Sequence, residues 1–351
     1  MPFLSQNNGE WYSVYDVTGS GTDVYKVDFF NIDTNRNMEI GVIWTLDDSK
    51  RDKNFSVYKI NSLEAGKENS VVSLATIQIS DYAYCDVDGD TADELLYFYF
   101  DGKSENATVN ARLIDYNSID NTLVPLSEVA LPFVFSSVKQ ILFDLENNKM
   151  RFYFDFISSS GTYFTEVIVY SRESEALSIP LLNGRNISSL SVRNSETFCC
   201  DFDNDGYYDI PLTLKYDDSY AVSGSDGSEA ALTFVHWYTY FDASFKSIGK
   251  YFINYYDDYS MKIDSVYDKF YIVYDIVNRV TQVCVKKSGD EKNIVFSVAL
   301  SKKQEDTVSI LPDGFLGAND ENRFNIVISA TGESYSFSEA FVKSLISDLK
   351  E

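Results

Sequence analysis

The sequence predicts an all-β fold of repeated, aromatic-rich sheets, followed by one short α-helix near the C-terminus. Aromatic residues make up 15% of the 351 residues, with 26 Tyr and 25 Phe, and these residue types favour strands. One acidic frame recurs between strand-like runs, which is the mark of a repeat architecture. Helical periodicity is almost absent before residue 337. With 44% hydrophobic residues the chain has ample material for a core.

The recurring frame is a loop with oxygen-bearing side chains at its first, third, fifth and ninth positions, flanked by β-forming runs. The three sets are Asn31, Asp33, Asn35 and Glu39; Asp86, Asp88, Asp90 and Glu94; and Asp201, Asp203, Asp205 and Asp209. The second loop starts 55 residues after the first, and the third starts 115 residues after the second. The longer interval is close to two of the shorter ones, so a further copy is expected midway.

"QILFDLENNKMRFYFDF" (140–156) supplies that copy in a decayed form. Asp144, Glu146 and Asn148 keep the first, third and fifth positions, but Phe152 has replaced the ninth. The frame therefore persists where its set of oxygen ligands does not.

Each period of about 57 residues holds about four strand-like stretches, which is the content of one propeller blade. In the second period the expected strands lie at 82–86, 93–101, 107–116 and 126–134. We therefore predict one β-propeller domain over 1–351, with six or seven blades. The expected repeats are 24–80, 81–137, 138–194, 195–253, 254–306 and a partial unit at 307–335, which the strand at 10–17 completes.

The segment "SFSEAFVKSLISDL" predicts an amphipathic C-terminal helix over 337–350. Ser336 and Glu339 have the spacing of a capping box. Phe341, Leu345 and Leu349 recur at four-residue spacing, which places them on one face.

Several carboxylates in one turn repel each other unless a cation lies between them, so the acidic loops are expected to bind a metal ion. Ca²⁺ is the expected ion, because it takes six to eight oxygen ligands. In the strongest loop, Asp201, Asp203, Asp205 and Asp209 would supply side chains and Tyr207 a backbone carbonyl, while Gly206 permits the required backbone angle. Ala92 holds the equivalent carbonyl position in the second loop. An EF-hand is disfavoured because its twelfth position needs an acid, and Leu212, Tyr97 and Val42 stand there. An ordinary metal-free Asp/Asn/Gly turn is the alternative for each loop.

In its acidic loops the chain resembles the FG-GAP/VCBS-type repeats, which are the propeller blades of integrin α-subunit heads and of many bacterial surface proteins. "DFDNDGYYDI" (201–210) matches their D-x-D-x-D-G-x-x-D pattern. The chain is also similar to VCBS-repeat lipoproteins of gut Firmicutes, through "WYSVYDVTGSGTDVYKVDFFNIDTNRNMEIGVIW", "FVHWYTYFD" and the terminal segment. The resemblance implies Ca²⁺ at the loops and a cell-surface address, but no established activity. Such relatives usually begin with a lipoprotein signal and a further acidic loop ahead of the stretch equivalent to Trp11, so a trimmed form is expected.

Charge excludes several partners. Lys and Arg number 29 against 54 Asp and Glu, and the net charge of −25 repels nucleic acid and anionic lipid. No apolar run approaches the length of a transmembrane helix. Cys85, Cys199, Cys200 and Cys284 lack metal-ligand spacing, and we interpret them as mostly buried apolar residues.

Catalytic signals are few. His236, the one histidine, lies in an aromatic strand, where a satisfied or partly buried imidazole is expected rather than a general base. Trp11, Trp44 and Trp237 could stack on a sugar or dock a protein, but a core position is expected for each. The favoured hypothesis is a monomeric, non-enzymatic, calcium-stabilised extracellular module that binds a surface protein or a carbohydrate. The alternative is a cell-surface polysaccharide hydrolase or lyase that uses carboxylates in the central cleft.

Overall fold

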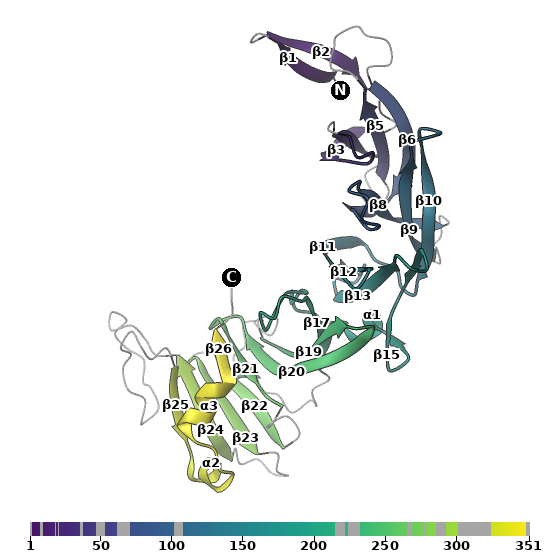
Figure 1. The fold of residues 1–351 in the computed structure, drawn as a ribbon. Helices are drawn as coiled ribbons and strands as arrows, with labels where there is room; N and C mark the ends of the chain where they lie inside the picture. Colours follow the sequence, from purple (N-terminus) through teal and green to yellow (C-terminus); the bar gives the residue numbers. More distant parts are fainter. Residues whose placement is uncertain are drawn as a thin grey trace. The chain divides into compact units, whose positions relative to one another are not determined.

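Aromatic and β-branched residues place most of the described chain in β-strands, so the predicted all-β class is confirmed (Figure 1). The computed structural model describes residues 2–7, 10–17, 19, 21–35, 38–46, 53–61, 71–101, 108–214, 222–223, 232–264, 269–276, 278–285, 293–300 and 324–348. The chain divides into two compact units. Unit 1 comprises residues 1–190 with 241–244, and unit 2 comprises residues 191–240 with 245–351. Closure of the sheets into one propeller ring stays a prediction.

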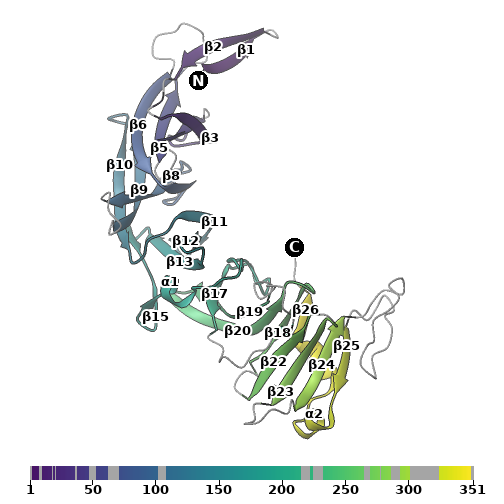
Figure 2. The same cartoon turned by 180° about the vertical axis from the view of Figure 1, so that it is seen from behind.

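Unit 1 contains three successive four-stranded antiparallel sheets, each formed by four strands that are consecutive in sequence (Figures 1 and 2). The first sheet consists of β3 (Asp23–Phe30), β4 (Glu39–Thr45), β5 (Lys53–Ile60) and β6 (Val71–Ile79). The second consists of β7 (Asp81–Cys85), β8 (Glu94–Asp101), β9 (Thr108–Asn117) and β10 (Thr122–Leu131). The third consists of β11 (Ser137–Glu146), β12 (Lys149–Ile157), β13 (Tyr163–Ser171) and β14 (Ala176–Ser178). The four strands expected in the second period are all present there.

Short elements flank these sheets. The expected strand at 10–17 exists as β2 (Glu10–Asp16), but within the described residues it pairs with β1 (Pro2–Asn7) in a separate hairpin. That it completes the partial unit at 307–335 stays a prediction. A hairpin of β15 (Leu181–Leu182) and β16 (Arg185–Asn186) leads into the single turn of α1 (Ile187–Leu190).

Unit 2 contains two five-stranded sheets. The first has the order β17 (Asp209–Thr213), β19 (Leu232–Phe241), β20 (Ser244–Asn254), β21 (Tyr259–Lys262) and β26 (Ile346–Asp348). The second has the order β18 (Val222–Ser223), β22 (Phe270–Asp275), β23 (Val280–Val285), β24 (Ile294–Leu300) and β25 (Phe324–Ile328). The last strand of the chain therefore joins the earlier of the two sheets.

The predicted C-terminal helix is shorter than expected and begins later. The structure has α2 (Ala330–Ser334) and α3 (Glu339–Leu345). The N-cap of α3 is Ser338, whose side chain accepts a hydrogen bond from the Phe341 N–H, so the expected capping box at Ser336 is wrong. Its apolar contact also differs, because Val342 is buried whereas Phe341 is 39% exposed. After Leu345 the chain turns extended as β26, which ends the expected 337–350 helix early, and Leu349 lies outside the described residues.

Side chains of β12 explain how the third sheet packs. Met150, Phe152, Phe154 and Phe156 alternate along the strand and enter one aromatic cluster, in which Phe154 meets Phe98 edge to face at 4.8 Å. The opposite face carries Arg151, Tyr153 and Asp155, all fully buried. A central strand buried on both faces reads as a nearly continuous apolar run, which is how this stretch appears in the sequence.

Buried tryptophans and cysteines agree with the sequence interpretation. Trp44 and Trp237 are core residues, with 6% and 1% of their surface exposed. Cys85, Cys199 and Cys284 are buried and Cys200 is exposed. No helix among the described residues is long and apolar enough to cross a membrane.

Glu166 is a buried acid on the apolar face of β13, between Phe164 and Ile168 of the aromatic cluster. It accepts hydrogen bonds from the Ser188 and Val167 N–H groups at 3.2 and 3.1 Å. Burial outweighs these bonds and raises its pKa from the ordinary 4.5 to about 7. Because the pKa of Glu166 is raised in the folded state, the protonated side chain makes its full contribution to the free energy of unfolding below pH 4.5. This contribution is lost as the pH rises through 7.

We expect Glu166→Gln to remove this loss. Between pH 5 and pH 8 the variant should gain about 2 kcal/mol in free energy of unfolding relative to the wild type, since only the wild type must ionise a buried acid. Urea unfolding at pH 5, 6.5 and 8 measures the difference. Stability curves that run parallel with pH in the two proteins would contradict it.

Candidate metal centres

The three acidic loops occupy equivalent places in the fold. The loop at 31–38 joins β3 to β4, and the loop at 86–93 joins β7 to β8, so each connects the first two strands of its sheet. The loop at 201–208 precedes β17, and an antiparallel bridge from Cys200 to Asp209 stands in place of the missing first strand. The recurring frame thus precedes a buried strand each time, an inner one for β4 and β8 and an edge strand for β17.

One hydrogen bond is common to all three loops. The ninth-position acid is fully buried and accepts from the N–H of the second residue, which closes the loop. The three bonds are Ile32 N–H to Glu39 at 3.0 Å, Val87 N–H to Glu94 at 2.7 Å, and Phe202 N–H to Asp209 at 2.8 Å. Asp209 also accepts from the Thr239 hydroxyl at 2.6 Å. The ninth-position acid therefore organises the loop backbone.

A second bond repeats within the loops. The N–H of the fifth residue donates to the third-position carboxylate, as in an Asx turn. These bonds are Asn35 N–H to Asp33 at 3.1 Å, Asp90 N–H to Asp88 at 3.0 Å, and Asp205 N–H to Asp203 at 3.3 Å. In the second and third loops the N–H of the seventh residue, Ala92 or Tyr207, donates to the fifth-position carboxylate.

Backbone angles show why the loops need particular residues. The fourth residue is left-handed in all three, with φ of 60° at Thr34, 92° at Gly89 and 61° at Asn204. The sixth residue is left-handed at Thr91, with φ of 80°, and at Gly206, with φ of 91°. Glycine and asparagine tolerate this region well. Thr91 holds the same angle without glycine, helped by its N–H, which donates to Asp86 at 3.1 Å.

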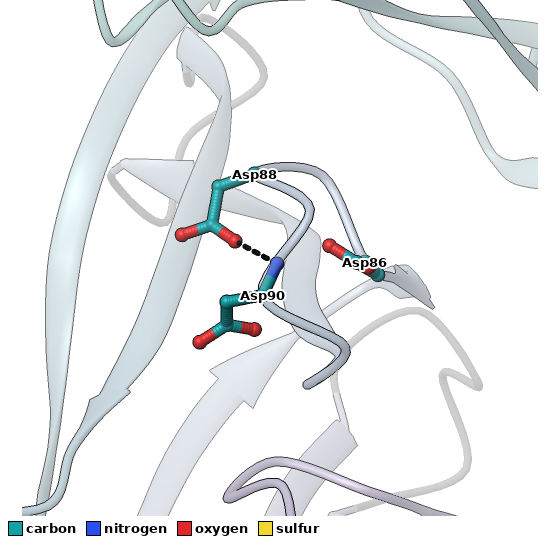
Figure 3. Close-up of side chains that lie close together, drawn as sticks. All are labelled: Asp86, Asp88 and Asp90. Carbon is teal, nitrogen blue, oxygen red and sulfur yellow. Dashed lines mark hydrogen bonds between the residues drawn. The ribbon is translucent and has the colours of Figure 1, made fainter.

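Two of the loops bring three carboxylates together. Asp86, Asp88 and Asp90 each place an oxygen within 4.8 Å of the others. Figure 3 shows the three side chains around one turn of the loop. Asp201, Asp203 and Asp209 do the same. Among the described residues, the other expected side-chain ligands of these loops, Asp205 and Glu94, lie outside the two groups.

The loop at 31–39 carries a cation of its own. The Lys59 ammonium, on β5, lies 2.6 Å from the Asp33 carboxylate, which is 4% exposed. It also donates to the Tyr116 hydroxyl at 2.8 Å. Burial alone would lower the pKa of Lys59, but the bonds to Asp33 and Tyr116 raise it. A fixed ammonium thus balances the charge of this loop.

The decayed copy at 144–152 also has an internal cation. It is a tight hairpin between β11 and β12, with Asn147 and Asn148 both left-handed. The Arg151 guanidinium, which is 1% exposed, pairs with Asp144 and with Glu146, each at 2.5 Å. An arginine therefore occupies the charge-balancing role at this corner, one position before Phe152.

In the part of the chain that the structure describes, neither three-aspartate group forms an ion pair with Lys or Arg. Arg172 comes near the second loop, but its guanidinium donates to the backbone carbonyl of Val87 at 2.6 Å. Burial, and then repulsion from Asp205 and Asp201, raise the pKa of Asp203. Burial likewise raises the pKa of Glu94 to about 8 and that of Asp209 to about 6. A bound cation would relieve this repulsion.

Buried oxygen atoms without a hydrogen bond test whether these loops fit a metal. Among the described residues, three carboxylate oxygens of the loops are buried and make no hydrogen bond. They are Glu39 Oε1, Glu94 Oε1 and Asp201 Oδ1. A buried carboxylate oxygen without a donor is costly, and a cation could be its partner, although Asp144 Oδ2 at the Arg151 corner is unpaired within the described residues as well. The donor set is carboxylate oxygen, which suits a hard divalent ion.

No comparable constellation surrounds the histidine. His236 Nε2 lies 2.6 Å from the Ser247 hydroxyl, and the ring packs on Tyr238 at 4.3 Å. Burial, and then Lys250, lower its pKa. The interpretation of His236 as a satisfied, partly buried side chain is confirmed.

Fold and site together define an all-β protein with two clusters of three aspartates, each of which could hold a metal ion. Beyond this class, a scan against protein-family models returned no match, and a search of curated protein sequences returned none either. The FG-GAP/VCBS resemblance therefore rests on the sequence motifs alone.

Replacing Arg151 tests the internal-cation interpretation. We expect Arg151→Met to lower the free energy of unfolding by about 3–5 kcal/mol, because it leaves Asp144 and Glu146 unpaired beside buried surface. The matched control is Arg112→Met, which breaks the half-exposed pair with Glu128 and should cost at most about 1 kcal/mol. Urea unfolding of both variants gives the comparison, and equal losses would contradict the interpretation.

Proposed function

We propose that this protein is a calcium-stabilised binding or assembly module that works outside the cell and catalyses no reaction. One contrast carries the proposal. Of four equivalent corners, two are balanced by a lysine or an arginine, and two gather three aspartates with no basic partner among the described residues. The second pair of corners needs a cation from solution.

Calcium is the ion that best suits these loops. Carboxylates at alternating loop positions, with backbone carbonyls between them, are ligands for Ca²⁺, whose flexible coordination accepts six to eight oxygens. Mg²⁺ demands a stricter octahedron and keeps its water, so it fits an irregular loop less well. Asp86, Asp88 and Asp90 would hold the ion in unit 1, and Asp201, Asp203 and Asp209 in unit 2.

A propeller is the architecture proposed for the whole chain, as a single, monomeric domain. Three consecutive four-stranded sheets with strands in sequential order support it, since each has the form of a blade. Two of the acidic loops join the first two strands of their sheets, so the recurring frame coincides with a recurring corner. The number of blades, six or seven, depends on closure of the ring.

The extracellular location follows from the calcium chemistry. Loops of modest affinity fill at the millimolar calcium concentration found outside cells, and extracellular modules are tuned to that range. A net charge of −25 also favours a solvated, non-nucleic-acid role. A surface protein or a carbohydrate is the proposed partner.

Thermal unfolding with and without a chelator tests the proposal. Calcium at ten times its dissociation constant should stabilise each site by about 1.4 kcal/mol, so EGTA should lower the melting temperature and CaCl₂ should restore it, whereas MgCl₂ should restore little. Asp203→Asn keeps the hydrogen-bond acceptor but removes a charge, so it should reduce the response, and Asp88→Asn with Asp203→Asn should abolish it.

The matched control is Asp258→Asn, an exposed acid of unit 2 outside both groups, which should keep the full response. Identical melting curves of the wild type with and without EGTA would overturn the proposal. A full calcium response in the double variant would show that the ion binds elsewhere.

A further inference from the structure

A pocket of about 520 Å³ opens in unit 1, away from the acidic loops. Residues of the first strands of three successive sheets, β3, β7 and β11, form most of its wall. None of the aspartates of the two metal-binding groups lines it. Its volume lies within the range of small-molecule binding pockets.

Aromatic rings supply the flat surfaces of the pocket. Tyr82 and Tyr84 lie parallel, with ring centroids 6.4 Å apart, on β7. Tyr25 and Phe143 line the pocket from β3 and β11 and stay 60% and 43% exposed. Exposure of such large apolar rings to water is unfavourable. Exposed rings that converge on one cavity therefore favour a ligand with an apolar face.

Charged groups in the pocket come in balanced pairs. Lys26 lies 2.8 Å from Asp28, which also accepts from the Tyr82 hydroxyl. Lys53 lines the wall together with Asp81 and donates to the Ser80 carbonyl at 2.9 Å. With two ammonium groups and two carboxylates, the wall carries no net charge to attract an ion. It instead offers donors and acceptors side by side, which suits adjacent hydroxyl groups.

Anionic and cationic ligands are therefore both disfavoured. An anionic ligand approaches a protein of net charge −25, and a cationic one meets Lys26 and Lys53, which already lie over the rings of Tyr82 and Tyr25 at 5.4 and 4.7 Å. A neutral molecule with an apolar face and a rim of hydroxyls satisfies both the rings and the charge pairs.

We propose that this pocket binds a neutral saccharide of one or two pyranose rings. The sugar's C–H face packs on Tyr25 and Phe143, and its hydroxyls meet Asp28, Asp81 and the two lysines. The inference rests on the proposed role as a binding module, but not on calcium, because the pocket and the acidic loops are built from different residues.

The experiment uses the full chain on a printed array of neutral, uronic-acid-containing and sulfated oligosaccharides. The strongest neutral disaccharide is then titrated by calorimetry, in CaCl₂ and again in EGTA. Tyr25→Ala and Phe143→Ala should each weaken binding about tenfold, because each removes one stacking surface. Phe29→Ala is the matched control, since Phe29 is 55% exposed on β3 but does not line the pocket. All three substitutions replace exposed rings, and thermal melts confirm that the variants are folded.

Binding of a neutral disaccharide that is weakened about tenfold in each of the two pocket variants and unchanged in Phe29→Ala supports the proposal. No binding of neutral sugars by the wild type, binding of acidic or peptide ligands only, or equal affinity in all variants would overturn it. Calcium-dependent melting without sugar binding would remove this inference and leave the calcium proposal intact. Sugar binding that is the same in EGTA would keep the inference even if melting proved calcium-independent. Cleavage of the bound sugar would retain the pocket but overturn the non-enzymatic role.

Discussion

Repulsion between acidic side chains at the corner before a buried strand is the constraint on which the sheet units depend. The ninth-position acid must be buried there, because it accepts the N–H that closes the loop. The other oxygens of the frame then crowd the same turn, and their charge must be balanced locally. Lys59 and Arg151 balance it at two corners. At the two remaining corners the same backbone framework surrounds three aspartates instead. Within this chain, two corners have a basic side chain beside their acids, and two gather three aspartates.

This view gives the decayed copy a physical meaning. Phe152 took the ninth position and points into the aromatic cluster of the third sheet, so the acid that closes the loop elsewhere is missing. The turn is a two-residue hairpin with two left-handed asparagines. Arg151, on the opposite face of β12, then reaches the acids that remain. The missing acid, the apolar packing of Phe152 and the internal cation therefore occur together at this corner.

Local patterns were enough to predict the strands and the loops, because both depend on residues near one another in sequence. The alternating aromatic runs predicted β7 to β10, and the acidic frame located all three corners. The basic partners were not predicted. Lys59 is 26 residues from Asp33 and meets it only once β5 has been placed in the sheet. The helix end also escaped prediction, because Ile346 leaves a helical pattern to pair with Met261 of β21, and a long-range strand pairing outweighs local propensity. The pocket was invisible for the same reason, since its wall comes from three separate sheets.

The return of β26 to the sheet of β17 to β21 has a consequence for synthesis on the ribosome. The edge of β21 has no partner until residues 346–348 have been translated, by which time the whole of the β22–β25 sheet has been made. An unpaired strand edge on a nascent chain is a place where neighbouring chains can add a strand of their own. The edge of β21 therefore stays open to such pairing until β26 is in place, and β26 closes it.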